Sequence, residues 1–388
     1  MESTIMRLEK INILLAPDSF KESLTATEVC QAMKLGIHNV NPNINVVSVP
    51  LADGGEGTLE ALVNANNGVI HYVDVLDPLG NTVSAPYGIL ENKAIAVVEM
   101  AKASGLMLVP PNKRNPLKTT TYGTGQLIKA CLNHNITKII IGIGGSATND
   151  GGVGAMQALG ISFKDQNAQE LSFGGENLEL LKAIDYSGLD PRLKNVAVEI
   201  AGDVANTLCG DFGASKVFAP QKGATEKEVD ILEKNLKFFG EFLEKTLEID
   251  IFNVKGLGAA GGLGCSLYAF LNAKMKSGID IVMENAELEE KIKKADMVWT
   301  GEGAVDKQTS FGKAPLGVAQ LAKKYNKFVV VLTGKIGSDI DILYESGIDA
   351  IFGIIDKNSK DEELFAKAKE NIRRTSENIL RLLKFKNN

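Results

Sequence analysis

The stretch Ile11-Asn12-Ile13-Leu14-Leu15-Ala16-Pro17-Asp18-Ser19 decides the fold class of this chain. Its apolar run ends in Pro-Asp-Ser, which is typical of a buried parallel strand followed by a loop. Thr25 and Glu28 then form a capping-box pattern at the start of a helix, and a second strand is predicted at 46–50. This order of strand, helix and strand favours a doubly wound parallel sheet.

The same alternation returns at the other end of the chain. Further strands are predicted at 297–300, 328–332 and 350–355. Between the two ends, residues 69–100 form short apolar runs broken by turns, which is typical of an antiparallel meander. We therefore expect one α/β domain with a parallel sheet built from both termini, an inserted α+β domain, and an active-site cleft between them. The predicted bounds are 1–68 with 286–388, and 69–285.

Bulk composition limits the classes of protein to which the chain can belong. Its 388 residues, of which 44% are hydrophobic and 23% charged, suit a globular protein of two domains. The net charge of −6 argues against a nucleic-acid-binding protein, and no stretch is apolar enough to span a membrane. The four cysteines form no CxxC pair and no secretory signal is visible, so we expect a cytoplasmic protein. The oligomeric state is left open, with a homodimer as one alternative.

A second informative stretch, Gly142–Gly152, is a glycine loop that follows an apolar run. Glycine loops expose backbone amides, and such amides bind phosphate oxygens. We therefore predict an anion site here, with polar side chains that could hold a metal ion or a hydroxyl group. Asp150 is a candidate catalytic residue. The candidate binding residues are Gly144, Gly145, Ser146, Thr148 and Asn149.

The same loop formally matches a dinucleotide-binding pattern, with Asp165 near the distance expected for a ribose contact. Gly256–Gly261 is a second formal match. Two matches in one chain show how weak this pattern is by itself. A nicotinamide-dependent hydroxy-acid oxidoreductase therefore stays an alternative, as does a non-catalytic sensor of nucleotides or sugar acids.

Two acidic motifs follow predicted strands, where ligands bind in open α/β sheets. In the first, Lys21 or Ser19 would contact an anion and Asp18 a metal ion or a hydroxyl, with an ordinary turn as the alternative. In the second, Asp53-Gly54-Gly55-Glu56-Gly57, the glycines permit close approach to an anion, and the two acids suit Mg²⁺ or a substrate hydroxyl. The alternative is a flexible turn in which Asp53 caps a helix.

Further candidates lie later in the chain. Asp203 follows an apolar run and is a candidate general base, with an ordinary turn aspartate as the alternative. Glu302 and Asp306 follow a later strand, and Lys313 precedes a proline-led helix, where it would strengthen an anion site. The segment is not a P-loop, because Lys307 stands where the first glycine should be. The three histidines lie outside these motifs. In an enzyme, carboxylates and lysines would therefore have to transfer protons and bind metal ions or anions.

Together these segments resemble the bacterial glycerate kinase family, with motifs in family order along nearly the whole chain. The resemblance implies ATP-dependent phosphorylation of D-glycerate to 2-phosphoglycerate, with phosphorylation of the 3-hydroxyl as the alternative. It also implies a flavodoxin-like or Rossmann-like domain from both termini with an inserted second domain. The matching segments are APDSFKESL (16–24), LADGGEGT (51–58), EMAKASGL (99–106), RNPLKTTTYGTG (114–125), GIGGSATNDGG (142–152), FAPQKGAT (218–225), GAAGGLG (258–264), TGEG (300–303) and GKAPLGVA (312–319).

The chain departs from the family's pattern at three places. Ala304 stands after Gly-Glu-Gly, where the family often has arginine. Gly202-Asp203-Val204 stands where Cys-Asp-Val is common, and Asn206-Thr207-Leu208 stands where Asn-Pro-Leu is common. An arginine therefore has no role after Gly-Glu-Gly here, whereas the acidic candidates are retained.

The resemblance leads to hypothetical roles in phosphoryl transfer. We expect the amides of Gly144–Ser146 to hold a phosphate of ATP. Lys21 and Lys313 would bind the glycerate carboxylate or stabilise the transferring phosphoryl group. Asp203 is the first candidate for the base, and Asp150 the second. Mg²⁺ would bridge the phosphates near Asp53, Glu56 or Asp150.

Overall fold

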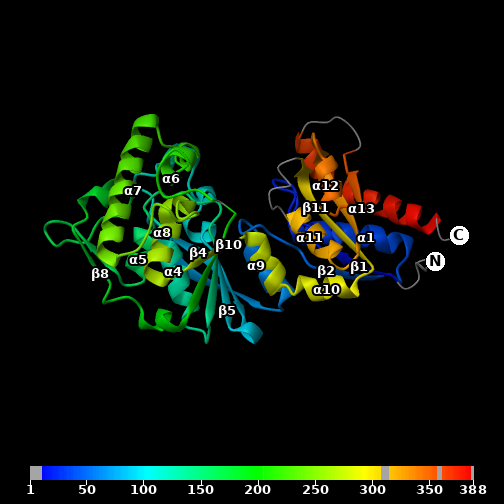
Figure 1. Cartoon of the computed structure of the whole chain (residues 1–388), viewed down its shortest axis with the longest axis horizontal. Coiled ribbons are helices and arrows are strands. Elements are labelled where there is room, and N and C mark those ends of the chain that lie inside the picture. The colour runs from blue at the N-terminus through cyan, green and yellow to red at the C-terminus, as the bar shows by residue number, and fades with distance from the viewer. Residues whose placement is uncertain (1–10, 204, 307–313, 356–360, 386–388) are drawn as a thin grey trace. The chain divides into compact units, whose positions relative to one another are not determined.

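The computed structural model describes residues 11–203, 205–306, 314–355 and 361–385. The chain divides into two compact units, and Figure 1 labels several of their elements. Unit 1 combines the chain up to Asp53 with the chain from Ile279 onward, and unit 2 runs from Gly54 to Gly278. One predicted site residue, Lys313, lies outside the described residues.

In the described part of the chain, the sheet of unit 1 has five strands in the order β13-β12-β11-β1-β2. All neighbouring strands run parallel. Numbered within the unit, this is the order 2-1-3-4-5 of flavodoxin-like folds, so the fold class predicted for the two termini is confirmed. The strands are β1 (Asn12–Leu15), β2 (Asn45–Ser48), β11 (Met297–Val305), β12 (Phe328–Ile336) and β13 (Ala350–Gly353).

The first helix of unit 1 begins at the predicted capping box. The Thr25 hydroxyl accepts a hydrogen bond from the Glu28 amide (3.3 Å), and the Glu28 carboxylate accepts one from the Thr25 amide (2.9 Å). These bonds satisfy backbone donors that a helix start leaves free. The helices are α1 (Ala26–Val40), α10 (Leu288–Lys294), α11 (Ala314–Lys323), α12 (Asp341–Glu345) and α13 (Asp361–Phe385), with α9 (Gly278–Asn285) at the unit boundary.

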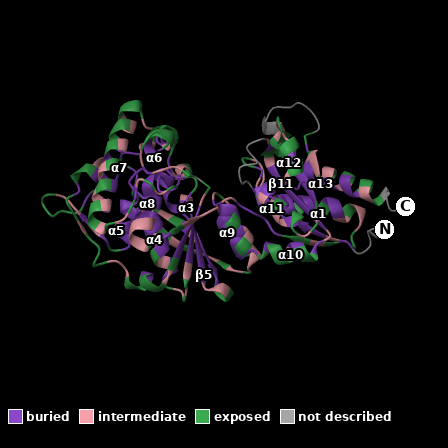
Figure 2. Ribbon diagram, in the orientation of Figure 1, coloured by how far each residue is buried: buried purple, intermediate pink, exposed green. Residues whose placement is uncertain are grey.

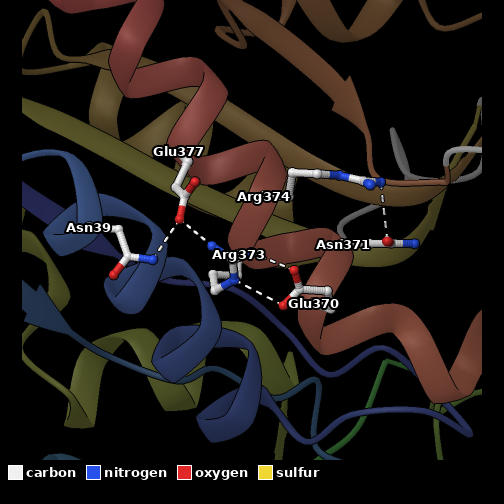
Figure 3. A network of polar contacts seen from close by, with 6 residues as sticks. All are labelled: Asn39, Glu370, Asn371, Arg373, Arg374 and Glu377. Carbon is white, nitrogen blue, oxygen red and sulfur yellow. Dashed lines mark hydrogen bonds and ion pairs between the residues drawn. The ribbon is translucent and has the colours of Figure 1, made fainter.

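Helices α1 and α13 pack at close range. A Cβ on Gly36 of α1 would lie 2.3 Å from the carbonyl oxygen of Arg373 on α13, so a larger residue would push the helices apart. The Arg373 guanidinium donates to the carboxylates of Glu370 and Glu377, and Glu377 also accepts from Asn39 on α1 (Figure 3). The core of unit 1 is therefore closed by helices from opposite ends of the chain.

Unit 2 contains a mixed sheet. Its strands, as far as the chain is described, follow the order β10-β9-β6-β5-β4-β3. The β3-β4-β5 part is antiparallel, which confirms the predicted meander, and the other neighbours are parallel. The strands are β3 (Val69–Leu76), β4 (Thr82–Leu90), β5 (Ile95–Glu99), β6 (Lys138–Gly142), β9 (Ala197–Ala201) and β10 (Lys274–Lys276), with a separate antiparallel pair β7 (Ser162–Lys164) and β8 (Ala183–Asp185).

The central strands of unit 2 are buried, as are most residues of α5 and α8, whereas α7 exposes one side (Figure 2). Strands that are covered on both faces read as continuous apolar runs, as in Ile139-Ile140-Ile141 of β6. None of the helices in the described ranges has an apolar stretch of the length that a bilayer requires. The helices are α2 (Thr58–Ala65), α3 (Ala101–Ser104), α4 (Tyr122–Cys131), α5 (Val153–Ala158), α6 (Ala214–Phe218), α7 (Glu226–Leu247) and α8 (Ala259–Leu271).

Helix α2 falls in unit 2, whereas the predicted bounds, 1–68 and 286–388, placed it with the two termini. Its contacts give the physical reason. Helix α2 packs on β4 and β5, and the Leu59 amide at its start donates to the buried carboxylate of Glu99 (2.8 Å). The boundary therefore lies after Asp53, inside the second acidic motif.

Candidate active site

Loops after three strands of unit 1 meet at one edge of its sheet. The Asp18 amide donates to the carbonyl of Gly301 on β11 (2.8 Å), and the Leu51 amide donates to the carbonyl of Pro17 (2.9 Å). In open α/β sheets, ligands bind at this edge where the strand order reverses, which here is between β1 and β11. The predicted residues on these loops and strand ends are Asp18, Ser19, Lys21, Asp53 and Glu302.

Carboxylates dominate this edge. Asp18 is buried, and burial raises its pKa to about 7, with the nearby carboxylates of Asp53 and Glu302 adding to the effect. The Ser19 amide opposes it by donating to Asp18 (2.6 Å). The Lys21 ammonium lies 3.6 Å from the Asp53 carboxylate and is largely exposed. Among the residues that the structure describes, the edge thus combines several acids with the accessible ammonium of Lys21, which suits hydroxyl, metal or anion binding.

Two predicted glycine motifs pack backbone against backbone in unit 2. A Cβ on Gly54 (φ +89°) would lie 2.7 Å from the carbonyl oxygen of Ala201, and one on Gly144 would lie 2.9 Å from the Cα of Gly55. Gly144 and Gly145 are exposed, and among the described residues no protein group accepts a hydrogen bond from their amides. Exposed amides after a parallel strand suit a bound anion.

Asp150 lies inside this loop and organises it. Its carboxylate accepts hydrogen bonds from the Thr121 amide and hydroxyl (both 2.8 Å) and from the amides of Gly152 (3.1 Å) and Gly154 (3.4 Å). Burial raises the Asp150 pKa, and the Thr121 and glycine donors oppose that effect. A carboxylate enclosed in this way positions the loop, and the catalytic and metal-binding roles of Asp150 stay predictions.

Lys222 also binds the Gly142–Gly152 loop, although no role was predicted for it from the sequence. It lies in a short 3₁₀ turn, Pro220–Lys222, and only 2% of it is exposed. Its ammonium donates to the Ser146 hydroxyl and to the Thr148 carbonyl, both at 2.7 Å. Burial lowers the Lys222 pKa to about 7, and the charge of Asp150 partly opposes this. The available signal was the family segment FAPQKGAT, in which this lysine stands.

The second dinucleotide-like pattern is a packing element of this loop. A Cβ on Gly261 (φ +67°) would lie 2.0 Å from the carbonyl oxygen of Thr148, and one on Gly262 would lie 2.9 Å from the Cα of Gly151. The Gly151 amide also donates to the carbonyl of Gly261 (3.0 Å). Gly261 of this pattern and the adjacent Gly262 therefore serve backbone contact with the loop.

A buried acid binds the start of α2, the helix that follows the Asp53–Gly57 motif. Glu99 ends β5, and burial raises its pKa to about 7 although the Leu59 amide donates to it. Lys102 lies 3.7 Å from Glu99 and 3.4 Å from Glu60. Glu99 and Lys102 stand in the family segment EMAKASGL but were not predicted as site residues.

The remaining predicted residues take varied positions. Asp203 is exposed after β9 and accepts from the Gly278 amide (3.0 Å), and Glu56 is exposed just before α2. Thr148 and Asn149 are fully buried, and Asn149 donates to the Ser215 hydroxyl (3.1 Å). Asp306 is partly buried after β11. The exposed position of Asp203 is compatible with its predicted role as a base.

The structure thus combines an α/β fold with a glycine loop that exposes Gly144 and Gly145 and with an acidic edge of the parallel sheet. The chain matches the glycerate kinase family model over residues 13–384. It is 49% identical over 369 residues to the glycerate 2-kinase of Escherichia coli K12, covering 95% of this chain and 97% of that one. It is 48% identical over 374 residues to the glycerate kinase of Bacillus subtilis 168, covering 96% and 98%.

A solved structure shares the whole fold. The putative glycerate kinase 2 from Salmonella typhimurium LT2 matches with a TM-score of 0.88 and 46% sequence identity, over 97% of this chain and 98% of that one. These matches extend through both units. The chain therefore belongs to the glycerate kinase family, and it is a kinase.

Proposed function

We propose that the protein transfers the γ-phosphoryl group of ATP to the 2-hydroxyl group of D-glycerate. Membership of the family supports glycerate as the substrate, and the name of the Escherichia coli relative, at 49% identity, supports the 2-position. The observation that carries the proposal is the pair of exposed amides at Gly144 and Gly145, which have no protein acceptor in the described part of the chain. These amides are suited to a phosphate group of ATP.

The acidic edge of unit 1 would recognise the small substrate. Lys21 supplies a positive charge for the glycerate carboxylate, and Lys313, outside the described residues, is the second candidate. Asp18, as an acid whose pKa lies near neutrality, can accept or donate a hydrogen bond to a hydroxyl group. Ser19, Glu302 and Asp306 are the further candidates for contacts with the substrate.

A magnesium ion that is shared with the nucleotide is part of the proposal. No cluster of three or more metal-binding side chains occurs among the described residues. Magnesium, however, commonly uses one or two carboxylates together with substrate phosphates and water. Asp53 and Glu56 would hold it, and when bound it would neutralise charge on the phosphates.

Asp203 would act as the base. In the proposed step, the glycerate hydroxyl oxygen forms a bond to the γ-phosphorus, the bond to the β–γ bridging oxygen breaks, and ADP leaves. The hydroxyl proton passes to the Asp203 carboxylate. Asp203 is preferred to Asp150, because it is exposed whereas Asp150 is enclosed by four donors.

Other properties stay predictions of the sequence. Phosphorylation at the 3-hydroxyl is the alternative reaction. A cytoplasmic location agrees with four cysteines that are all free thiols, and a homodimer is an open alternative to a monomer.

An assay of ADP release with D-glycerate and Mg·ATP tests the proposal, with the phosphoglycerate product read by enolase. We expect an enolase signal without added phosphoglycerate mutase, because enolase acts on the 2-phosphate. A signal that appears only after mutase is added would show a 3-kinase. Absence of ADP release with either enantiomer of glycerate would refute the proposed reaction.

The same assay tests the proposed role of Asp203 as the general base. Asp203→Asn should lower kcat by about 10²- to 10⁴-fold, the usual contribution of general base catalysis. Asp211→Asn is a suitable control, because Asp211 is also exposed on unit 2 and pairs with Lys216 (2.8 Å). Near-normal turnover of Asp203→Asn would assign the base elsewhere.

A further inference from the structure

We infer that Lys222 is a positioning residue that shapes the Gly142–Gly152 loop for a nucleotide phosphate, without touching the nucleotide itself. The inference rests on the proposed function. Lys222 is buried beside the loop. Its ammonium donates hydrogen bonds to the Ser146 hydroxyl and to the Thr148 carbonyl (both 2.7 Å).

Burial of this lysine is costly for the fold. Only 2% of Lys222 is exposed, and no carboxylate within the described ranges forms an ion pair with its ammonium. A buried ammonium group without a paired acid is among the less favourable groups in a protein interior, and an apolar side chain of similar size would be tolerated as well or better. Stability alone therefore gives no reason for a lysine at this position.

The hydrogen bonds show what the lysine provides. The carbonyl of Gly145 accepts from the Leu106 amide (2.8 Å), and the carbonyl of Ala147 accepts from the Thr119 hydroxyl (2.8 Å). Lys222 adds a further bond of this kind, at Thr148. The carbonyl groups of Gly145, Ala147 and Thr148 are thus bound to protein donors, while Gly144 and Gly145 themselves remain exposed.

This arrangement favours a ligand of negative charge. A loop tip that presents amides, with its carbonyl groups engaged, carries a positive local potential. When protonated, the buried Lys222 ammonium adds to that potential, because electrostatic interactions are stronger in a protein interior than in water, and the Asp150 carboxylate of the same loop partly opposes it. A phosphate group is favoured, and a cation is disfavoured.

Lys222→Met and Lys222→Gln test the inference, with Lys216→Met as the control. Lys216 is exposed on α6 and pairs with Asp211, so its loss removes a lysine charge from unit 2 without changing the loop. The measurements are the Kd of ADP by calorimetry, the KM values of ATP and D-glycerate, kcat, and the thermal midpoint of unfolding.

We expect Lys222→Met to weaken ADP binding and raise the KM of ATP at least tenfold, with the KM of glycerate changed less than twofold. Lys222→Gln, which can still donate to Ser146 or Thr148, should recover part of the loss. The control should behave like the wild-type protein. If Lys222→Met unfolds at a much lower temperature, the same comparison is made with Lys222→Gln.

Two results would overturn the inference. An ADP Kd within twofold of the wild-type value in a folded variant would show that Lys222 has no positioning role. A rise confined to the KM of glycerate would show that the loop serves the carboxylate of the other substrate. Failure of the proposed function is distinguishable, because the wild-type protein itself would then neither bind ADP nor phosphorylate glycerate.

Discussion

At the scale of single residues, the glycine motifs and the acidic motif after β1 are informative because their constraints are local. Gly54 needs a positive φ and no side chain, and the residues around it show a turn after a strand. No comparable pattern in the neighbouring sequence marks Lys222 or Glu99. Each becomes a candidate only when its burial and its hydrogen-bond partners are known, and these depend on segments far away in the sequence.

The raised pKa of Asp18 leads to a prediction about stability and pH. Because the folded protein holds this proton up to about pH 7 and the unfolded chain releases it near pH 4, the free energy of unfolding falls as pH rises between these values. Asp18→Asn has no ionisable group at this position, so its free energy of unfolding should not fall for this reason. At pH 8 in magnesium-free buffer, the variant should be more stable than the wild-type protein by on the order of 2 kcal/mol, while glycerate turnover falls.

Urea denaturation at pH 8 and pH 5 measures this difference. The advantage of Asp18→Asn should shrink at pH 5, where the wild-type carboxyl group is protonated in the folded state. Equal advantages at both pH values would mean that the Asp18 charge is not the cause.

At the scale of elements, the glycine-rich start of α8 supports the loop that would bind phosphate. Residues Ala260 to Gly262 have positive φ values, so the helix begins with an irregular turn that reaches the loop backbone. The sequence pattern could be interpreted as a dinucleotide site, because the same glycines permit both a ligand and a second backbone to approach. Only the contact between Gly261 and Thr148 decides between these alternatives.

Gly261→Ala tests that contact. The new Cβ would lie 2.0 Å from the Thr148 carbonyl oxygen, at a φ of +67° that alanine rarely adopts. We expect a loss of more than about 3 kcal/mol in the free energy of unfolding, together with weaker ADP binding. Gly80→Ala is the matched control, because Gly80 has a φ of +84° with nothing within 4 Å of its Cβ position.

The control separates backbone strain from the steric clash. Gly80→Ala should cost only about 1–2 kcal/mol, which is the price of the left-handed conformation itself. Similar losses in the two variants would show that the close approach of α8 to the loop is unimportant.

At the scale of the whole molecule, unit 1 depends on both ends of the chain. Trp299, the single tryptophan, is fully buried in β11 and belongs to the same core cluster as Met33 of α1 and Ile372 of α13. Its fluorescence therefore reports on unit 1. Circular dichroism reports on the helices of both units.

Removal of residues 361–388 should destabilise unit 1 and leave unit 2 folded. We expect the Trp299 fluorescence transition to move to a much lower denaturant concentration, because α1 loses its apolar partner, while circular dichroism keeps a later transition. A chain ending at Phe385 is the control, since it retains α13. Simultaneous loss of both signals would show that the two units do not unfold independently.

The sequence by itself determined the parallel sheet, its assembly from both termini, the inserted meander and the glycine motifs. Apolar periodicity and turn chemistry act over a few residues, so they can be recognised without knowing the fold. Tertiary structure decided that α2 belongs to unit 2, that Asp150 is enclosed, and that Lys222 binds the glycine loop and Glu99 the start of α2. Burial, and the hydrogen bonds and pKa shifts that follow from it, arises from contacts between distant segments, which exist only once the chain has folded.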